Sequence, residues 1–349
     1  MAYTTVNKST DYFNTKLYTG NATARTIDVG FQPDLVWGKL RSTTGNHWLW
    51  DSIRGVNYYL KSNAADGNNS STTDLTGFVS NGFTVGTGTR MNTNSQTMAS
   101  WNWKAGTAVS GSTTGSGTAK TYTGSVNTTA GFSIIKYVGN GTAGHTIPHH
   151  LGTANIGSIF VKNLDSGSDY WYSYHKPLGA TKTFILNETD GVGTNTMWNN
   201  AAPTSSVFSV GASSGSNSNN DNYIAYIFSD VQGYCKTGKY TGNGSSTDGT
   251  FIYTGFKPAF VITKSTTVEA WQMTDSVRDK NVSPNFARLV PNLSSAESTN
   301  TTWAKVEKFS NGFKIGGNDS ISNENGTEYL YITFGQSLVG SNNVPCTAR

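Results

Sequence analysis

The 349-residue sequence predicts an all-β protein of three tandem, related β-sandwich-like domains, of jelly-roll or lectin-like type, with very little helix. Short β-prone runs are punctuated throughout by Gly, Asn-Gly and Pro. Apolar residues nowhere recur at helical spacing over a dozen positions. Aromatic residues make up 12% of the chain and charged residues only 13%, which is typical of folded, turn-rich β structure and not of disorder.

Three copies of one pattern run through the chain. Each begins near a tyrosine followed by a Gly-Asn pair, in Leu17-Tyr-Thr-Gly-Asn21, Lys136-Tyr-Val-Gly-Asn-Gly141 and Lys239-Tyr-Thr-Gly-Asn-Gly244. Each ends on an aromatic strand, at residues 100–103, 225–228 and 331–334. Repeats of this length are domain-sized units and not the turns of a solenoid.

The repeats divide the chain in order. We expect an N-terminal arm over residues 1–16, which docks on a neighbour or on the first domain, and a first β domain over residues 17–106. Residues 107–130 are almost entirely Gly, Ser, Thr and Ala, and predict a linker or an exposed ribbon. The second domain spans residues 131–233, and the third, with a C-terminal tail, spans residues 234–349. Three similar domains permit either a line or a pseudo-threefold disc.

Asn-Gly pairs mark where we expect strands to reverse, because glycine adopts the positive φ that two-residue hairpin turns require. The pairs are Asn81-Gly82, Asn140-Gly141, Asn243-Gly244, Asn311-Gly312 and Asn325-Gly326.

Charge and hydropathy exclude some classes of partner. The net charge is +4, without any run of Lys or Arg, so the electrostatic footprint of nucleic-acid binding is absent. No stretch has the length and apolarity of a membrane helix, and the N-terminus has no apolar signal segment. We therefore expect a soluble chain, made without a cleaved export signal. Cys235 and Cys346 are expected to be free thiols, or alternatively a staple that holds the C-terminal tail.

Motifs for catalysis or metal binding are weak. His145, His149 and His150 form the histidine cluster of the sequence, but Pro148 prevents a helix there and no carboxylate lies near in sequence. A surface strand and turn is favoured over a metal or pH-sensing site. The repeated pairs Asp51/Arg54 and Asp275/Arg278 predict a structural ion pair or turn in each domain. We expect no catalytic residues, no metal and no cofactor.

Aromatic residues are the candidate ligand-binding groups. Six of them fall at comparable places in the three copies, and alternation along a strand would turn half of each group outward. Exposed rings stack on sugar faces, while Asn and Asp supply hydrogen bonds, so glycan binding is predicted. The alternative is that most of these rings belong to the core. The candidates are Trp48, Trp50, Trp171, Tyr172, Tyr174 and Trp271.

The repeated motifs, with Trp101-Asn-Trp-Lys-Ala-Gly106 and the closing Leu338-Val-Gly-Ser-Asn-Asn-Val-Pro345, resemble a family of repeat-bearing tail fibre or virion structural proteins of tailed bacteriophages. These are frequent in marine and cyanobacterial phages. The resemblance covers nearly the whole chain and carries no assigned chemistry. It implies a location on the virion, at the tail or a fibre, with the capsid surface as the alternative.

The resemblance also implies partners. They are other virion proteins, further copies of this chain, with a trimer favoured, and a host surface polysaccharide. The resulting hypothesis is a structural protein that attaches to the host, by weak aromatic and amide contacts multiplied over many copies. A capsid decoration or head-fibre protein is the first alternative. A polysaccharide depolymerase is less favoured, because it needs two carboxylates at the scissile bond and the recurring ones have basic neighbours.

Overall fold

The computed structural model describes residues 3–279, 286–300 and 305–340. Almost every element in these ranges is an antiparallel β-strand, which confirms the all-β prediction. The helices of the described residues are the single-turn α1 (Thr89–Asn92) and α2 (Ser214–Asn217) and the 3-10 turns η1 (Ser9–Asp11) and η2 (Lys176–Leu178). None of them has the length and apolarity needed to cross a membrane.

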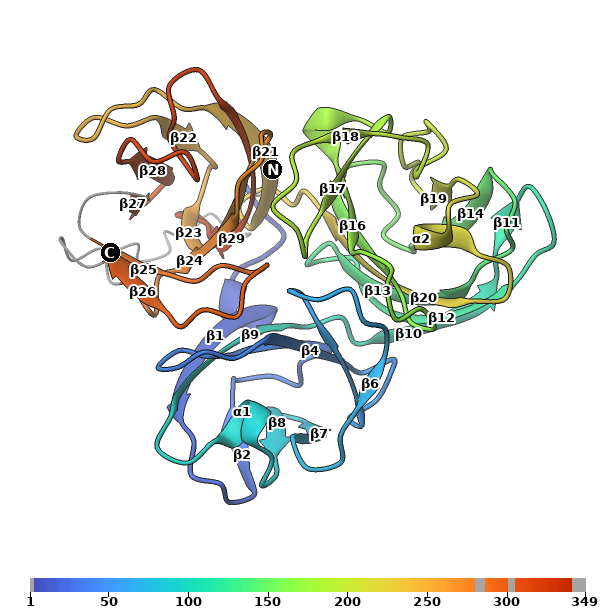
Figure 1. Cartoon of the computed structure of the whole chain (residues 1–349), viewed down its shortest axis with the longest axis horizontal. Helices are drawn as coiled ribbons and strands as arrows, with labels where there is room; N and C mark the ends of the chain where they lie inside the picture. Colours follow the sequence, from blue (N-terminus) through green and yellow to red (C-terminus); the bar gives the residue numbers. More distant parts are fainter. Residues whose placement is uncertain (1–2, 280–285, 301–304, 341–349) are drawn as a thin grey trace.

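The strands form three lobes around a common centre (Figure 1). The first lobe contains β1 to β9, the second β10 to β20 and the third β21 to β29. In every lobe a large inner sheet faces the centre and a small three-stranded outer sheet covers its far side. Of the two arrangements that the repeats permit, the lobes therefore take the pseudo-threefold one.

The inner sheet of the first lobe has the order β1-β9-β3-β4-β5-β6, and the outer sheet has the order β2-β8-β7. Their bounds are β1 (Phe13–Thr19), β2 (Arg25–Asp28), β3 (Leu35–Leu40), β4 (His47–Asp51), β5 (Tyr58–Lys61), β6 (Asn69–Ser70), β7 (Leu75–Val79), β8 (Gly82–Val85) and β9 (Thr97–Trp103).

The second lobe has the inner order β10-β12-β13-β20-β15-β16-β17-β18 and the outer order β11-β14-β19. Their bounds are β10 (Thr107–Ser112), β11 (Thr114–Gly115), β12 (Thr121–Asn127), β13 (Phe132–Val138), β14 (His145–Pro148), β15 (Ile156–Asn163), β16 (Tyr172–His175), β17 (Lys182–Ile185), β18 (Gly193–Thr194), β19 (Val207–Val210) and β20 (Asn222–Ser229).

The third lobe has the inner order β21-β29-β23-β24 and the outer order β22-β28-β27, and β25 pairs with β26 beside them. Their bounds are β21 (Cys235–Thr241), β22 (Phe251–Tyr253), β23 (Lys257–Ser265), β24 (Trp271–Asp275), β25 (Phe286–Arg288), β26 (Ser298–Asn300), β27 (Lys305–Phe309), β28 (Gly312–Gly316) and β29 (Glu328–Gln336).

The three lobes share one hydrophobic core at the centre. It draws buried residues from all three inner sheets, while a separate cluster fills the space between the two sheets of each lobe. Three rings at corresponding strand ends, Trp103, Phe228 and Phe334, form a triangle with centroid separations of 6.1, 5.8 and 5.3 Å. Because all three lobes contribute to this one core, the structure does not show three domains with separate cores. The division of the chain into three separate domains stays a prediction.

The recurring Tyr-x-Gly-Asn motif holds the end of the first strand of each copy to a buried asparagine near the end of that copy. The tyrosine hydroxyl donates to a backbone carbonyl at 2.7–2.8 Å, and the motif asparagine donates its backbone N–H to the buried side-chain oxygen. The repeat is therefore a structural clasp. Its tyrosines are Tyr18, Tyr137 and Tyr240, and its buried asparagines are Asn92, Asn217 and Asn323.

The Asn-Gly pairs serve two different purposes. Gly141, Gly244 and Gly326 have φ of 74°, 64° and 79°, as predicted for turns. The strands do reverse at Asn81-Gly82 and Asn311-Gly312, as predicted, but Gly82 and Gly312 do not have positive φ, so that part of the prediction was wrong. A Cβ there would lie 2.0 Å from the Ile27 carbonyl oxygen and 2.2 Å from that of Ile252, and glycine is needed because two backbones come so close.

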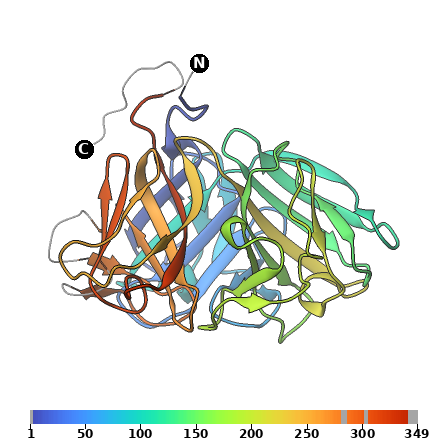
Figure 2. The same cartoon turned by 90° about the horizontal axis from the view of Figure 1, so that it is seen from above.

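The arm packs into the fold along the third lobe, beginning beside β21 where this lobe faces the second, and then leads into β1 of the first lobe (Figures 1 and 2). Val6 is buried, the Ser9 N–H donates to Gln336 Oε1 at 2.7 Å, and Gln336 Nε2 donates to the Asn7 carbonyl at 3.1 Å. The arm thus contacts the third lobe as well as leading into the first, which was not expected.

Residues 107–130 supply three strands, β10 and β12 of the inner sheet and β11 of the outer sheet. β10 pairs with β12 along its whole length, and β12 pairs with β13, so the segment is an exposed ribbon and not a loose linker. The Thr-Tyr-Thr run at the start of β12 supplies β-prone residues for this pairing. The C-terminal tail, residues 341–349, lies outside the described residues.

Candidate functional site

The six aromatic residues predicted to bind glycan lie mostly in the core. Trp48, Trp50, Trp171, Tyr174 and Trp271 are buried, and Tyr172 is half-buried. Alternation along a strand did not turn them outward, because each inner sheet is covered on one face by the centre and on the other by its outer sheet. The five buried rings are not available for sugar stacking, so the structure favours the alternative that most of these residues belong to the core.

Two of these tryptophans connect neighbouring lobes. Trp171 donates from Nε1 to the carbonyl of Lys61 in the first lobe at 2.8 Å. Trp271 donates from Nε1 to the carbonyl of Ile185 in the second lobe at 3.1 Å. Their recurrence at one place in the repeats thus reflects contacts between lobes.

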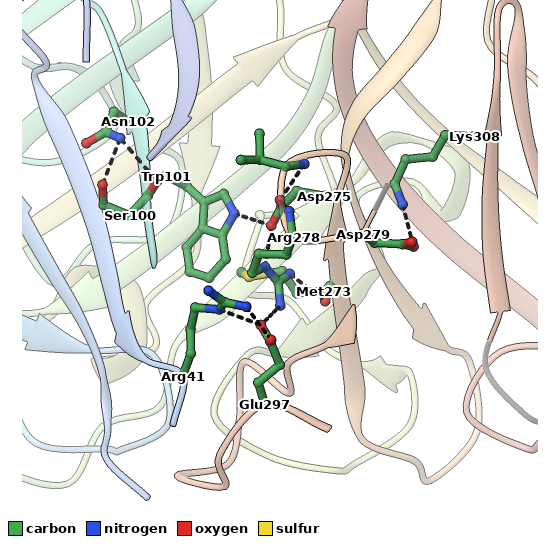
Figure 3. A network of polar contacts seen from close by, with 11 residues as sticks. Arg41, Ser100, Trp101, Asn102, Met273, Asp275, Arg278, Asp279, Glu297 and Lys308 are labelled. Atoms are coloured by element: carbon green, nitrogen blue, oxygen red, sulfur yellow. Dashed lines mark hydrogen bonds and ion pairs between the residues drawn. The ribbon is translucent and has the colours of Figure 1, made fainter. Parts of the chain in front are cut away.

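The repeated Asp-x-x-Arg pairs are structural, as predicted, and they also extend across the boundaries between lobes. Asp275 Oδ2 accepts from Arg278 Nε at 2.5 Å and from Trp101 Nε1 of the first lobe at 3.0 Å. Glu297 then bridges Arg278 to Arg41 of the first lobe, at 3.0 and 2.6 Å (Figure 3). Burial alone would raise the pKa of Asp275, but the charge of Arg278 and the hydrogen bonds from Arg278 and Trp101 together outweigh burial and hold that pKa below its ordinary value.

The boundary between the first and second lobes repeats this arrangement with a tyrosine. Arg54 Nε donates to Asp51 Oδ2 at 2.5 Å, and the Tyr226 hydroxyl of the second lobe donates to the same oxygen at 2.7 Å. Tyr226 occupies in its strand the place that Trp101 occupies in the first lobe, since both precede the rings of the central triangle by two residues. At this repeated position an aspartate thus accepts from a tyrosine hydroxyl at one boundary and from a tryptophan N–H at the other.

The boundary between the second and third lobes has neither the Asp–Arg pair nor the aromatic donor. His175 and Leu178 stand where the other lobes have Asp and Arg, because His175 pairs with Ser158 as Asp51 pairs with Leu35. Ile332 stands in the place of the donor. Burial lowers the pKa of His175 to about 3, and its Nε2 lies 3.2 Å from the Tyr331 carbonyl oxygen. Neither the Asp and Arg pair nor an aromatic donor stands at these places, so this position of the boundary has no buried Asp–Arg ion pair.

Three buried lysines occupy one repeated position, and sequence inspection missed them. Lys39, Lys162 and Lys264 stand in the central strands β3, β15 and β23, and each ammonium donates to a backbone carbonyl of the neighbouring lobe. Burial lowers the pKa of each to about 8. Aligning the ends of these strands, Trp-Gly-Lys39, Phe-Val-Lys162 and Ile-Thr-Lys264, would have revealed them.

A surface pocket of about 360 Å³ opens where the arm, the second lobe and the third lobe meet. The lining includes two tyrosines, two amide side chains, one carboxylate and one ammonium group. These residues are Tyr3 from the arm, Asn155, Asp230 and Gln232 from the second lobe and the connection after it, and Lys236 and Tyr253 from the third lobe. None of these side chains was selected from the sequence.

A family model agrees with the extent of the ring. The model described as a domain of unknown function (DUF7483) matches residues 8–337 of the chain. The chain belongs to this family. No curated protein and no solved structure matches it. Since the match runs through all three lobes, the DUF7483 unit is the whole ring and not a single repeat.

The histidine cluster of this DUF7483 chain is divided among separate partners. His145 contacts Asn217 Oδ1 at 2.9 Å and Thr113 Oγ1 at 2.6 Å, while His149 lies 3.1 Å from the Thr204 carbonyl oxygen. In the part of the chain that the structure describes, no group of His, Cys, Asp and Glu side chains could hold a metal ion. The strand predicted here is β14, but His145 and His149 are buried and not on the surface.

Cys235 is a buried free thiol, as predicted, and burial raises its pKa well above the ordinary value. Cys346 lies outside the described residues.

Proposed function

We propose that this chain is a structural component of a phage virion, at the tail or a fibre, where it contacts host cell-surface glycans. One observation supports a structural role above the others. A single chain closes three lobes about one shared aromatic core, with repeated polar contacts at two of the boundaries between lobes. Such a ring suits a structural role, because its lobes cannot separate without exposing the shared apolar core to water. The resemblance to virion proteins supplies the location.

The proposal includes no catalytic role. The carboxylates that recur in the copies, Asp51 and Asp275, are each buried and held by an arginine of their own lobe. A glycosidase needs carboxylates that reach a sugar from either side of the scissile bond. These two groups instead stabilise boundaries between lobes.

Other virion proteins and further copies of the chain are the proposed partners, with a trimer favoured. Light scattering of the purified chain gives the copy number directly, because one chain has a mass of 37.4 kDa. A mass three times larger agrees with a trimer. A mass of one chain would show a monomer, and the pseudo-threefold arrangement would then exist only within the single chain.

Immunogold labelling of intact particles tests the location. We expect label at the tail tip or on the fibres. Label spread over the head would make the chain a capsid decoration or head-fibre protein, and particles without label would overturn a virion role altogether.

A further inference from the structure

We propose that the pocket between the arm, the second lobe and the third lobe is a binding site for a neutral sugar, with Tyr253 as its stacking platform. This inference rests on the proposed contact with host glycans. It assigns that contact to residues other than the buried tryptophans.

The pocket has the size and composition that a sugar unit requires. Its volume of about 360 Å³ falls in the range of small-ligand sites. A sugar presents hydroxyl groups around its edge and C–H groups on its faces, so it needs hydrogen-bonding side chains beside an aromatic ring. Gln232, Asn155 and Asp230 supply the first, with Asn155 also bonded to the Asp230 carbonyl and to the Lys176 ammonium, and Tyr253 supplies the second.

Tyr253 stands out from the surface. It is 58% exposed at the end of β22, and Lys236 is held beside it, with Nζ 5.5 Å from the ring centroid and donating to the Tyr253 carbonyl at 2.8 Å. A Cβ placed on Gly255 would lie 2.7 Å from the Tyr3 hydroxyl oxygen and 3.6 Å from that of Tyr253. The hydroxyl groups of Tyr3 and Tyr253 therefore lie close to each other at the pocket, above Gly255.

Two further rings lie on the outer sheet next to Tyr253. Phe251 precedes it by two residues on the same face of β22, and is 47% exposed. Its ring packs edge to face on Phe309, at a centroid separation of 6.0 Å. A polysaccharide chain held in the pocket at Tyr253 can continue over these rings, so the site is open to internal units of a polymer and not only to its end.

The other two lobes lack this surface, which serves as a control within the molecule. The registers of the outer sheets place Ile27, Ile147 and Ile252 at one repeated position. Asp28 in the first lobe and Pro148 in the second then stand where the third has Tyr253. The rings are an addition to the third lobe that the shared fold does not need.

The charges of the pocket favour an uncharged ligand. Asp230 accepts the Thr237 N–H at 2.7 Å, and its other oxygen lies 3.6 Å from the ammonium of Lys176. Burial raises the pKa of this carboxyl. Lys236 is the other charged side chain of the lining and is held against Tyr253, so the pocket contains no cluster of like charges to select an acidic sugar.

Saturation-transfer NMR on the full chain tests the site with glucose, galactose, mannose and N-acetylglucosamine at millimolar concentration, and with glucuronate as the charged comparison. We expect at least one neutral sugar to give a signal that Tyr253→Ala and Gln232→Ala each reduce severalfold. Tyr58→Ala is the matched control, because Tyr58 is an exposed tyrosine of the first lobe. It should leave the signal unchanged.

The inference is overturned if no neutral sugar binds, if the signal survives Tyr253→Ala, or if only glucuronate binds. Thermal melts of the variants show whether a lost signal reflects lost fold, and Gln232→Ala, at an exposed position, provides a second measurement. The outcome is separate from that of the labelling experiment. Labelled tails without sugar binding leave the virion role standing and remove only the site.

Discussion

Replacing Tyr226 by phenylalanine tests whether the boundaries between lobes stabilise the ring. The substitution removes one hydroxyl, which donates to Asp51 Oδ2 at 2.7 Å and lies 3.3 Å from Arg54 Nη2. The ring itself stays, stacked on Trp171 at a centroid separation of 6.0 Å, so no cavity opens. A hydrogen bond to a charged group contributes about 1.5–3 kcal/mol, and we expect Tyr226→Phe to lower the free energy of unfolding by about 2 kcal/mol.

The matched control is Tyr137→Phe. Its hydroxyl is also buried and also makes a 2.7 Å hydrogen bond, but to the neutral carbonyl of Ser216 within one lobe. The expected cost is about 1 kcal/mol. Urea titration of both variants, followed by fluorescence and by circular dichroism, gives the two free energies. Coincident transitions would show that the chain unfolds as one unit, as a shared core requires.

A double-mutant cycle with Asp51→Asn isolates the contact. If the hydroxyl acts through Asp51, the two changes together cost less than their sum, with a coupling energy of about 0.5–3 kcal/mol. The reasoning fails if Tyr226→Phe costs no more than Tyr137→Phe, or if the two changes add without coupling. Separate transitions for separate lobes would also contradict it.

Three further predictions follow from the same structure. Phe228→Ala removes one ring from the central triangle and should cost about 3–5 kcal/mol of unfolding free energy in chemical denaturation, against less than about 0.5 kcal/mol for exposed Tyr58→Ala. Deleting residues 1–12 removes buried Val6 and the contacts of the arm with the third lobe, so the melting temperature should fall; an unchanged value would show that the arm is dispensable. Burial lowers the pKa of Lys264 to about 8 from an ordinary 10.5, so the unfolded chain binds more protons at this lysine between these values, and Lys264 should add about 1 kcal/mol of stability per pH unit there. Lys264→Met should reduce that slope, and a slope identical to that of the unchanged chain would refute this assignment.

The sequence contained enough information for the class and the repeats because both depend on local signals. Glycine, Asn-Gly and aromatic strand ends are visible in any one copy, and comparison of copies located the Asp-x-x-Arg pairs that the structure confirms. The burial of the aromatic side chains, in contrast, depends on how the lobes pack together. The closure of the ring decides whether the second face of a strand contacts water or another lobe. Alternation of side chains within one strand cannot predict this.

The candidate site could have been found in part. Phe251 and Tyr253 flank Ile252 in the third copy, where the first copy has Thr26 and Asp28 around Ile27. An apolar residue on both faces of a short outer strand is a visible departure from the other copies. The pocket beside it could not be predicted, because it forms only where the arm returns to the third lobe.

Joining the three lobes in one polypeptide removes the dependence on concentration that limits an assembly of separate subunits. A trimer of identical chains falls apart when it is diluted far enough, since its stability varies with the concentration of its protomers. Here the peptide connections at residues 104–106 and 230–234 keep each lobe permanently beside its neighbours. Dilution therefore cannot separate the three lobes of the ring from one another.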